Sequence, residues 1–306
     1  MARERYTAQV ALLVRALPVI ADEPSFALKG GTAINLFYRD MPRLSVDIDL
    51  TYLPLDERAT ALAAIDTAFD RMVERARQLL PGVDAHRING GGDVDTRLLL
   101  RAAGAEVKVE VSPVLRGTVA PPRVMRVTDA VEEVFGFAET SVLAFEDLFA
   151  GKLCAALDRQ HPRDLYDVHL LYQHEGLTGA LFRTFLVYAA CSGRPLHELI
   201  DPNRIAIDRA FADEFDGMTI EPVPLATLLA ARERLIEDIG SRMTGAAAAF
   251  LLSIHDVEPD FDLIRLPGAA ELPAIRWKLL NLRKLKDGNP DKHADQRARL
   301  LAALRI

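Results

Sequence analysis

The chain has 306 residues, 50% of them hydrophobic and 26% charged, a composition that excludes a disordered or collagen-like protein and, at this length, allows two domains. The formal net charge of −7 argues against a protein that binds nucleic acid over its whole surface. Two cysteines, Cys154 and Cys191, are too few for a disulfide framework and lack the spacing of a metal site.

The first half of the chain alternates between helix-like and strand-like patterns. The predicted helices cover residues 6–17, 32–38 and 56–80. The predicted strands cover residues 25–28, 46–53, 95–102 and 105–111, the last two joined as a hairpin by Ala103-Gly104. Residues 118–126, with Pro121-Pro122, are typical of a connection or an edge strand.

Beyond Phe145 the 3.6-residue period of a helix dominates. The predicted helices cover residues 146–159, 162–173, 177–191, 225–240, 245–255, 272–286 and 291–305. We therefore predict an α+β fold, with an α/β domain over residues 1–140 and a helical domain over residues 141–306. The last helices are basic, because residues 274–306 hold nine Lys or Arg and three Asp, a net charge of +6. This charge is compatible with an RNA contact or with charged helices that face water.

Asp47 and Asp49 form the most informative pair in the sequence. Residues i and i+2 of a strand point to the same side, so a divalent cation such as Mg²⁺ would relieve the repulsion between the two carboxylates. The alternative is an ordinary acidic pair on a solvated edge strand. Gly30-Gly31-Thr32 favours the metal site, because glycines that end a strand and open a helix present backbone N–H groups to a phosphate. Thr32 would add a hydroxyl there or act as the N-cap of the helix.

Glu110 is a candidate third carboxylate. It shares one face of its predicted strand with Lys108, while valines occupy the other face. If this strand neighbours the one that carries Asp47 and Asp49, the three carboxylates could hold two metal ions. The alternative, of nearly equal weight, is a Lys108–Glu110 ion pair on a solvated sheet face.

At this point the sequence resembles a known family. The pattern Gly30–Thr32, followed by Ser45–Asp49, is similar to the signature of the DNA polymerase β-like nucleotidyltransferase superfamily. The longer string Phe26–Ala33, with Arg43–Asp47 after it, resembles the AbiEii/AbiGii toxin family, which includes the MenT-like toxins. The resemblance covers about residues 26–171. It implies a nucleotidyltransferase lobe, with a mixed sheet flanked by helices, followed by an all-helical C-terminal lobe that completes the active site.

A second block carries the same resemblance. Lys152 and the stretch Arg163–Asp167 match a lysine and an Arg-Asp-x-x-Asp motif in the helical lobe of the family. Lys152 is a compact cation suited to triphosphate oxygens, the alternative being a solvated helix lysine. Asp164 is interpreted as the ion-pair partner of a nearby cation. Asp167 is preferred as the aspartate that orients Lys152 or activates the acceptor hydroxyl, although the choice between the two stays open.

Arg43 and Ser45 flank the predicted pocket. Arg43 would contact a phosphate of the nucleotide or RNA, or pair with Asp47 or Asp49 when no ligand is bound. Ser45 lies two residues before Asp47 on the carboxylate face. It would either make a local hydrogen bond or serve as a phosphorylation site that places a charge of about −2 beside the carboxylates.

The resemblance implies a Mg²⁺-dependent nucleotidyltransferase that uses NTP, with Mn²⁺ as an alternative ion. The residues assigned to nucleotide binding are Gly30, Gly31, Thr32, Arg43, Ser45 and Lys152. The residues assigned to the metal are Asp47, Asp49 and Glu110, and those assigned to catalysis are Asp47, Asp49, Lys152 and Asp167.

The resemblance further implies a toxin of a toxin–antitoxin or phage-defence system, with an AbiEi-like antitoxin as partner. Its expected acceptor is RNA, in particular the 3′ end of tRNA, so that nucleotide addition would block translation. The alternatives are transfer to a protein hydroxyl or a small molecule, and a non-catalytic nucleotide-binding module. No hydrophobic run reaches the ~18–20 residues of a membrane helix, and Arg15 and Pro18 interrupt the N-terminal stretch, so we expect a cytoplasmic protein without membrane contact.

Overall fold

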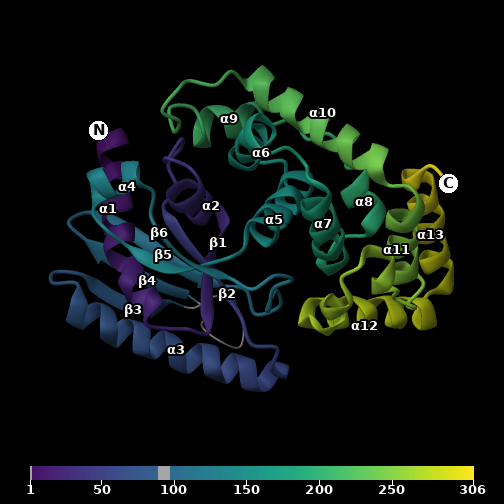
Figure 1. Ribbon diagram of the computed structural model, residues 1–306, viewed down its shortest axis with the longest axis horizontal. Helices are drawn as coiled ribbons and strands as arrows, with labels where there is room; N and C mark the ends of the chain where they lie inside the picture. The colour runs from purple at the N-terminus through teal and green to yellow at the C-terminus, as the bar shows by residue number, and fades with distance from the viewer. Residues whose placement is uncertain (1, 89–96) are drawn as a thin grey trace. The chain divides into compact units, whose positions relative to one another are not determined.

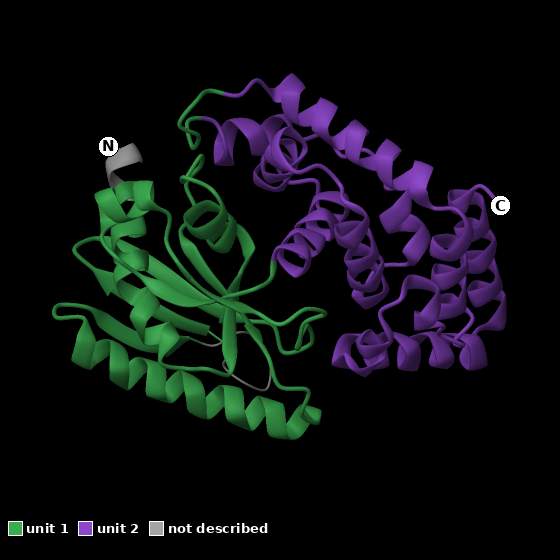
Figure 2. Cartoon of the chain, viewed as in Figure 1, with its two compact units in different colours: residues 1–144, 217–222 green, residues 145–216, 223–306 purple. Residues whose placement is uncertain are grey.

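The computed structural model of the chain describes residues 2–88 and 97–306, with the side chains from residue 6 onward. Two compact units are present (Figure 2). Unit 1 comprises residues 1–144 and 217–222, and unit 2 comprises residues 145–216 and 223–306. Residues 217–222 thus belong to the first unit although the chain on either side of them belongs to the second.

A seven-stranded sheet forms the centre of unit 1 (Figure 1). Its strands are β1 (Phe26–Lys29), β2 (Asp47–Tyr52), β3 (Asp84–Ile88), β4 (Arg97–Ala102), β5 (Ala105–Val111), β6 (Arg123–Arg126) and β7 (Glu139–Val142). Their order is β3-β4-β5-β2-β1-β7-β6. The pairs β2–β5 and β1–β7 are parallel and the other pairs are antiparallel, so the sheet is mixed. The predicted α+β fold with a mixed sheet is confirmed.

Helices pack against this sheet. They are α1 (Ala2–Ala21), α2 (Gly30–Ala33) with its π-helical continuation η1 (Ile34–Tyr38), α3 (Arg58–Leu79) and α4 (Asp129–Phe135). On the face covered by α3, the Phe26 ring packs edge-on against Tyr52 at 5.5 Å and Phe69 at 6.3 Å between ring centroids. The short helix α2 lies on the opposite face, which carries the polar residues of β2 (Figure 1). One face of the sheet is thus buried against α3, and the other face carries the polar side chains of a candidate site.

Turn chemistry explains why the β4–β5 hairpin was predictable. Ala103 and Gly104 have φ angles of +48° and +81°, as a tight turn that matches the twist of a hairpin requires. β6 lies at the edge of the sheet, as the prolines before it predicted. β3, α4 and β7 were not predicted. β3 is polar in sequence and mostly half-buried, so it shows no clear alternation.

Unit 2 is built from helices. They are α5 (Phe145–Asp158), α6 (Pro162–His174), α7 (Gly179–Cys191), α8 (Leu196–Ile200), α9 (Asp208–Glu214), α10 (Leu225–Arg242), α11 (Gly245–His255), η2 (Phe261–Ile264), η3 (Pro267–Glu271), α12 (Pro273–Gly288) and α13 (Pro290–Leu304). The seven long helices agree with the predicted ones within a few residues at each end. The shorter α8 and α9 were missed, because five to seven residues are too few to display a helical period.

Two further features concern membrane-spanning helices and the state of the cysteines. Among the helices within residues 2–88 and 97–306, none is long and apolar enough to span a bilayer. Cys154 and Cys191 are free thiols, and burial raises the pKa of each well above that of an exposed thiol, which favours the protonated form.

Candidate active site

β2 presents two carboxylates on one face of the sheet. Ile48 and Leu50 are fully buried on the helix-covered face, while Asp47 and Asp49 alternate with them and are only partly buried. The alternation therefore fixes the direction of both acidic side chains through the burial of their neighbours. Asp47 and Asp49 share one face as the sequence predicted, and their role as metal ligands stays a prediction.

Gly30 allows the chain to pass close to this acidic pair. Its φ of +76° lies in the left-handed region, and a Cβ at this position would stand 2.6 Å from Oδ2 of Asp49. A Cβ at Gly31 would stand 2.6 Å from Nη2 of Arg43 and 2.8 Å from Oγ of Ser45. Any other residue at position 30 would both strain the backbone and push the Asp49 carboxylate away. The two glycines thus create a bare backbone surface beside the carboxylates.

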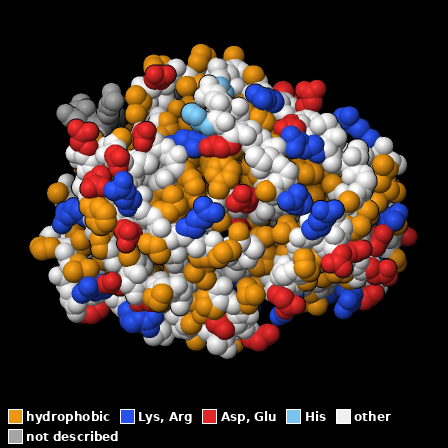
Figure 3. Space-filling view, in the orientation of Figure 1, with side chains coloured by type: hydrophobic (Ala, Val, Ile, Leu, Met, Phe, Trp, Pro, Cys, Tyr) orange, Lys and Arg blue, Asp and Glu red, His pale blue; other side chains and the backbone are white. Residues whose placement is uncertain are grey.

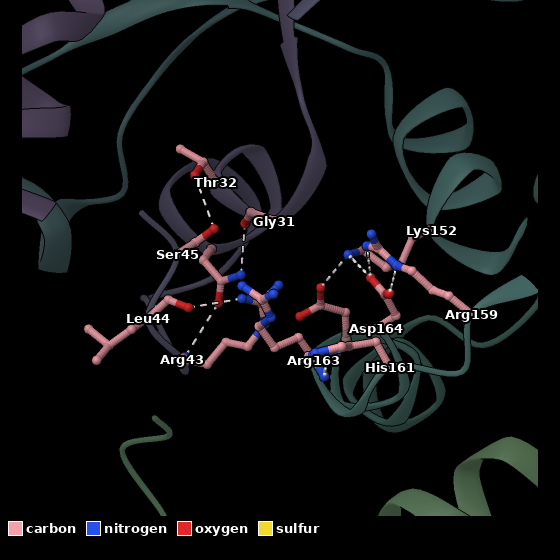
Figure 4. Close-up of polar contacts among 12 residues, drawn as sticks. Gly31, Thr32, Arg43, Leu44, Ser45, Lys152, Arg159, His161, Arg163 and Asp164 are labelled. Atoms are coloured by element: carbon pink, nitrogen blue, oxygen red, sulfur yellow. Dashed lines mark hydrogen bonds and ion pairs between the residues drawn. The ribbon is translucent and has the colours of Figure 1, made fainter. Parts of the chain in front are cut away.

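Thr32 has a structural role that the sequence did not reveal. Its side chain is buried, and its hydroxyl donates to the backbone carbonyl of Asp47 at 2.5 Å. The same hydroxyl oxygen lies within hydrogen-bond distance, 3.1 Å, of Oγ of Ser45 (Figure 4). It therefore ties the first helical turn to the start of β2. The expectation that Thr32 caps the helix is wrong, because α2 begins at Gly30 and Lys29 occupies the N-cap position. Its contact with a nucleotide stays a prediction.

Arg43 is buried beside the glycine turn. Its Nη1 donates to the carbonyl of Leu44 at 2.9 Å, and its backbone N–H donates to Oδ1 of Asn35 at 3.3 Å (Figure 4). The amide of Asn35 donates in turn to the carbonyl of Gly31 at 2.8 Å. Asn35 therefore links Arg43 to the turn, a connection that the sequence analysis missed.

A segment far along the chain also holds Arg43. Arg43 forms a β-bridge with Thr219, the N–H of Leu44 donates to Met218, and the N–H of Ile220 donates to Pro42. These contacts explain why residues 217–222 belong to unit 1. No local pattern in the sequence announces them, because the paired residues lie more than 170 positions apart.

Glu110 lies next to Asp49, on the parallel neighbour β5. The expected adjacency of the two strands is therefore present, but the Glu110 carboxylate forms ion pairs with Arg97 and, at 3.1 Å, with Lys108. Within the described part of the chain, no group of three His, Cys, Asp or Glu side chains is gathered closely enough to hold a metal ion. The structure thus contains the Lys108–Glu110 pair that was the alternative interpretation, and a metal role for Glu110 stays a prediction.

Lys29 is a candidate site residue to which the sequence analysis gave no role. It ends β1 directly opposite Asp49 in the antiparallel register, so its side chain shares the acidic face. Burial lowers the pKa of the Lys29 ammonium, while the negative charges of Asp49 and Glu110 act to raise it. A charged row therefore crosses the sheet from Lys29 through Asp49 and Glu110 to Arg97. A lysine that ends an apolar strand just before two glycines is the signal that could have indicated it.

In unit 2, Lys152 is buried with two carboxylates rather than solvated. It is 7% exposed, and its Nζ lies 2.7 Å from Asp164 and 2.9 Å from Asp167 (Figure 4). Asp164 also accepts two hydrogen bonds from Arg159, at 2.5 and 3.1 Å. Burial by itself would raise the pKa of Asp164, but Lys152 and Arg159 outweigh that effect and hold the pKa well below its ordinary value. Asp164 is thus engaged by two cations, as expected of an ion-pair partner.

The loop between α5 and α6 positions this cluster. Gln160 has a φ of +50° and is buried, and its amide donates to Asn203 and accepts from the N–H of Ile205 and from Arg232. His161 begins α6 by accepting from the N–H of Arg163 through Nδ1 at 3.2 Å, while Nε2 contacts Glu214. Histidine at this position therefore has a structural role at the start of α6.

Both motif blocks lie within a stretch of the chain that matches a known family. A family model described as the nucleotidyl transferase AbiEii toxin of type IV toxin–antitoxin systems matches residues 11–280. The chain belongs to the AbiEii family. The resemblance inferred from the sequence is thereby confirmed, and the chain is a nucleotidyltransferase toxin of a type IV toxin–antitoxin system.

A solved structure shares this fold. MenT4, a nucleotidyltransferase toxin from Mycobacterium tuberculosis H37Rv, superimposes with a TM-score of 0.60 over 90% of this chain and 93% of its own, at 16% sequence identity. At that sequence identity, the similarity shows that the two proteins share a fold and shows nothing further about this AbiEii protein. Comparison with curated proteins finds no match.

Proposed function

We propose that this AbiEii enzyme transfers a nucleoside monophosphate from NTP to the 3′-terminal hydroxyl of an RNA, in particular tRNA. The observation that carries the proposal is the pair Asp47 and Asp49 on one face of β2, with the bare backbone of Gly30 pressed against the Asp49 carboxylate. A carboxylate pair beside glycine N–H groups at the start of a helix combines the ligands that a divalent cation and a triphosphate each require.

The donor set fits Mg²⁺, which binds oxygen ligands and commonly takes one or two carboxylates together with substrate phosphates. We assign Asp47 and Asp49 as its ligands, with Glu110 joining them if its pairs with Arg97 and Lys108 open. When bound, Mg²⁺ or Mn²⁺ would supply positive charge for the phosphate oxygens. Space for the Asp49 carboxylate, which any Cβ at position 30 would fill, is the feature of the fold that supports this fit.

In the proposed reaction the acceptor hydroxyl oxygen bonds to the α-phosphorus of NTP. The bond from that phosphorus to the bridging oxygen breaks, pyrophosphate leaves with the electron pair, and the hydroxyl proton passes to water. The N–H groups of Gly30 and Gly31 would bind the phosphates, and Arg43, held by Asn35 and Leu44, would add a fixed positive charge. The hydroxyls of Thr32 and Ser45 already bond to each other and would bind nucleotide only at the edge of this arrangement.

We assign Lys152 to the phosphates and Asp167 to the orientation of Lys152, on the strength of the family motif and of the cluster within unit 2. Lys152 is bonded to both Asp164 and Asp167, and Asp164 also pairs with Arg159. Removing the charge of Asp167 would therefore leave the Arg159–Asp164 pair in place. Asp167→Asn should lower activity with the cluster folded, whereas Asp164→Asn should lower stability as well, because Arg159 and Lys152 both lose a partner.

A transfer assay tests the whole proposal. The protein is incubated with Mg²⁺, each labelled NTP in turn and total RNA, with Asp47→Ala as the inactive control. Label should enter RNA of tRNA size with the wild type alone and should disappear with EDTA. Equal incorporation by Asp47→Ala would refute the assignment of the carboxylates. Label on protein or on a small molecule would refute RNA as acceptor while leaving the transfer reaction intact.

Addition to the 3′ end of tRNA would block aminoacylation and so translation, which is the expected action of a toxin. Protein synthesis in a cell-free translation extract provides the measurement. It should stop when wild-type enzyme is added with NTP and should continue when Asp47→Ala is added. Continued synthesis with wild-type enzyme that is labelling RNA would show that the modified RNA is not a translation component. The antitoxin partner implied by the family should relieve the arrest.

A further inference from the structure

The helix α12 presents an aromatic side chain to solvent. Its inner face is apolar and buried, through Ala274, Ile275 and Leu282. On its outer face Trp277 is 52% exposed and Leu280 is 43% exposed. Trp277 is the single tryptophan of the chain. Tryptophan is costly to leave in water and is concentrated at binding surfaces, so its exposure on a helix requires an explanation.

Three cations share the solvent-exposed side of α12 with Trp277. Lys284, seven positions later, lies on nearly the same line of the helix, about two turns along. Arg276 and Arg283 are also exposed, but lie roughly 100° and 120° round the helix from Trp277. Arg276 forms an ion pair with Glu271. Arg283 and Lys284 form no ion pair with an acidic side chain among residues 6–88 and 97–306.

The helix is fixed rigidly behind this face. Lys278 points inward and is buried, and its Nζ donates to the carbonyls of Ser192 at 2.8 Å and Arg194 at 2.6 Å. These carbonyls belong to the segment that directly follows α7, so Lys278 ties α12 to the C-terminal end of that helix. Trp277 therefore projects from a support that needs no ordering when a ligand arrives, which lowers the entropic cost of binding.

We propose that Trp277, Arg276, Arg283 and Lys284 form a binding face for single-stranded RNA, with a base stacked on the indole and phosphates held by the cations. A flat aromatic flanked by basic residues is what single-stranded nucleic acid selects, because every base has a π face and every linkage carries a negative charge. The proposal rests on RNA being the acceptor and names where its unpaired segment is held.

Charge distribution supports a local face rather than a general one. On the face of the molecule in Figure 3, acidic and basic side chains are interspersed and exposed hydrophobic side chains lie among them. Phe137 offers a comparison within the chain, since it is 62% exposed but follows the acidic helix α4, with Asp129, Glu132 and Glu133. An exposed aromatic alone is therefore not the signal; its cationic surroundings are.

The single tryptophan makes a direct test possible. The full-length Asp47→Ala protein, which cannot turn over substrate, is titrated with a short single-stranded RNA while the emission of Trp277 is recorded. Stacking should quench the emission, with the same midpoint as the anisotropy of end-labelled RNA. Anisotropy that reports binding while the emission stays unchanged would overturn the proposal, and so would the absence of any binding.

Variants separate stacking from simple burial. Trp277→Ala should weaken RNA binding roughly 5- to 100-fold, Trp277→Leu should be as weak although it stays apolar, and Trp277→Phe should recover most of the affinity. Phe137→Ala is the matched control and should bind as the parent protein does. Circular dichroism melting checks that each variant is folded. A Trp277→Leu protein that binds RNA as tightly as its parent would refute stacking.

Salt dependence tests the cations. The double variant Arg283→Gln/Lys284→Gln should reduce the slope of log affinity against log salt by about 1.4, or about 0.7 for each lost phosphate contact with a single strand. An unchanged slope would refute the assignment of Arg283 and Lys284 to phosphate contacts. Arg123→Gln on β6 is the control for this measurement.

Other outcomes identify other occupants. If the Trp277 emission responds to protein concentration, and sedimentation shows dimers, the face binds a second copy and the RNA proposal fails. If the transfer assay labels RNA but RNA does not quench the Trp277 emission, the proposed binding face is refuted and the proposed function is not. If RNA quenches the Trp277 emission but no nucleotide is transferred, the proposed function is refuted and the binding face is not.

Discussion

Gly30 meets two separate requirements at the end of β1. Its positive φ disfavours any residue with a side chain, and its missing Cβ leaves room for Oδ2 of Asp49. Gly104 shows the first requirement by itself, since it has a φ of +81° and a Cβ there would meet nothing within 4 Å. The chain thus contains its own control for separating backbone strain from the loss of the carboxylate position.

Gly30→Ala should therefore cost about 1–2 kcal/mol of stability through strain and should also weaken Mn²⁺ binding and transfer at least tenfold. Gly104→Ala should show a comparable loss of stability with metal binding and transfer intact. Denaturant unfolding and Mn²⁺ electron paramagnetic resonance provide the two measurements. Equal Mn²⁺ affinity in both variants would contradict a role of Gly30 in placing Asp49.

Lys29 faces the carboxylates from the neighbouring strand and directly precedes the glycine N–H groups. We expect Lys29→Met to raise KM for NTP about tenfold, because a positive charge near the phosphates is lost. The same variant should bind Mn²⁺ at least as tightly as the wild type, since a competing cation is removed. Lys292→Met is the control, because Lys292 is exposed on α13 and takes no part in the proposed site. Weaker Mn²⁺ binding in Lys29→Met would show that Lys29 instead supports the fold of the site.

At the scale of elements, loops rather than helices decide where the cations and carboxylates lie. α5 and α6 are regular, but the residue between them, Gln160, has left-handed backbone and is held by three hydrogen bonds of its amide. The strain of that conformation is offset by these bonds. The geometry of Lys152 relative to Asp164 therefore depends on a side chain that touches neither.

Gln160→Met keeps the size of the side chain but removes these hydrogen bonds. It should lower the free energy of unfolding by about 1–3 kcal/mol, because the N–H of Ile205 and the carbonyl of Asn203 lose their partner. Gln173→Met, at an exposed position on α6, should change stability by less than about 0.5 kcal/mol. Urea unfolding checks both. No difference between the two variants would mean that the loop is held by other contacts.

The bridge between Arg43 and Thr219 makes a second element-scale prediction. Ile220 is 57% exposed, but its N–H donates to Pro42 at 3.0 Å. Ile220→Pro removes that donor and should raise KM for NTP roughly three- to tenfold by loosening Arg43, given about 1 kcal/mol for one hydrogen bond. Ile220→Ala keeps the N–H and should leave KM unchanged. Similar KM values for the two variants would exclude the bridge as a support for Arg43.

At the scale of the whole molecule, buried histidines make stability depend on pH. His255 on α11 and His293 on α13 stack at 4.3 Å, and each ring lies within hydrogen-bond distance of the backbone carbonyl of the other. Burial lowers the pKa of His255, despite the hydrogen bond to His293 and the charge of Asp256. Burial also lowers the pKa of His169 and of His197. These groups stay neutral in the folded protein at pH values where the unfolded chain takes up protons.

The unfolded state therefore binds more protons below the ordinary histidine pKa of about 6.5, so stability is complete above that pH and falls below it. We expect a loss approaching about 1.4 kcal/mol per pH unit for each such histidine. Urea unfolding at about pH 7.5, 6.5 and 5.5 measures it. His255→Gln, which cannot titrate, should give a shallower slope than the wild type. A slope that is the same in both would exclude His255 as a source.

Much of the site was predictable because its signals are local. Alternation along residues 47–50 fixed which side chains share a face, and two glycines at a strand end indicated a close approach to the backbone. Both follow from the geometry of a single strand or turn. The prediction that Thr32 caps a helix failed for a related reason, since the start of a helix shifts by two residues without any change in its pattern.

The sequence by itself therefore determined the family, the α+β class and the residues that carry the acidic and glycine-rich motifs. Only the tertiary structure decided which residues lie beside them: Lys29 across from Asp49, Arg97 against Glu110, and Thr219 paired with Arg43. The physical reason is that periodicity encodes the face on which a side chain points, whereas neighbours across a sheet are selected by strand order and register. Those depend on the packing of the whole chain, so no window of the sequence contains them.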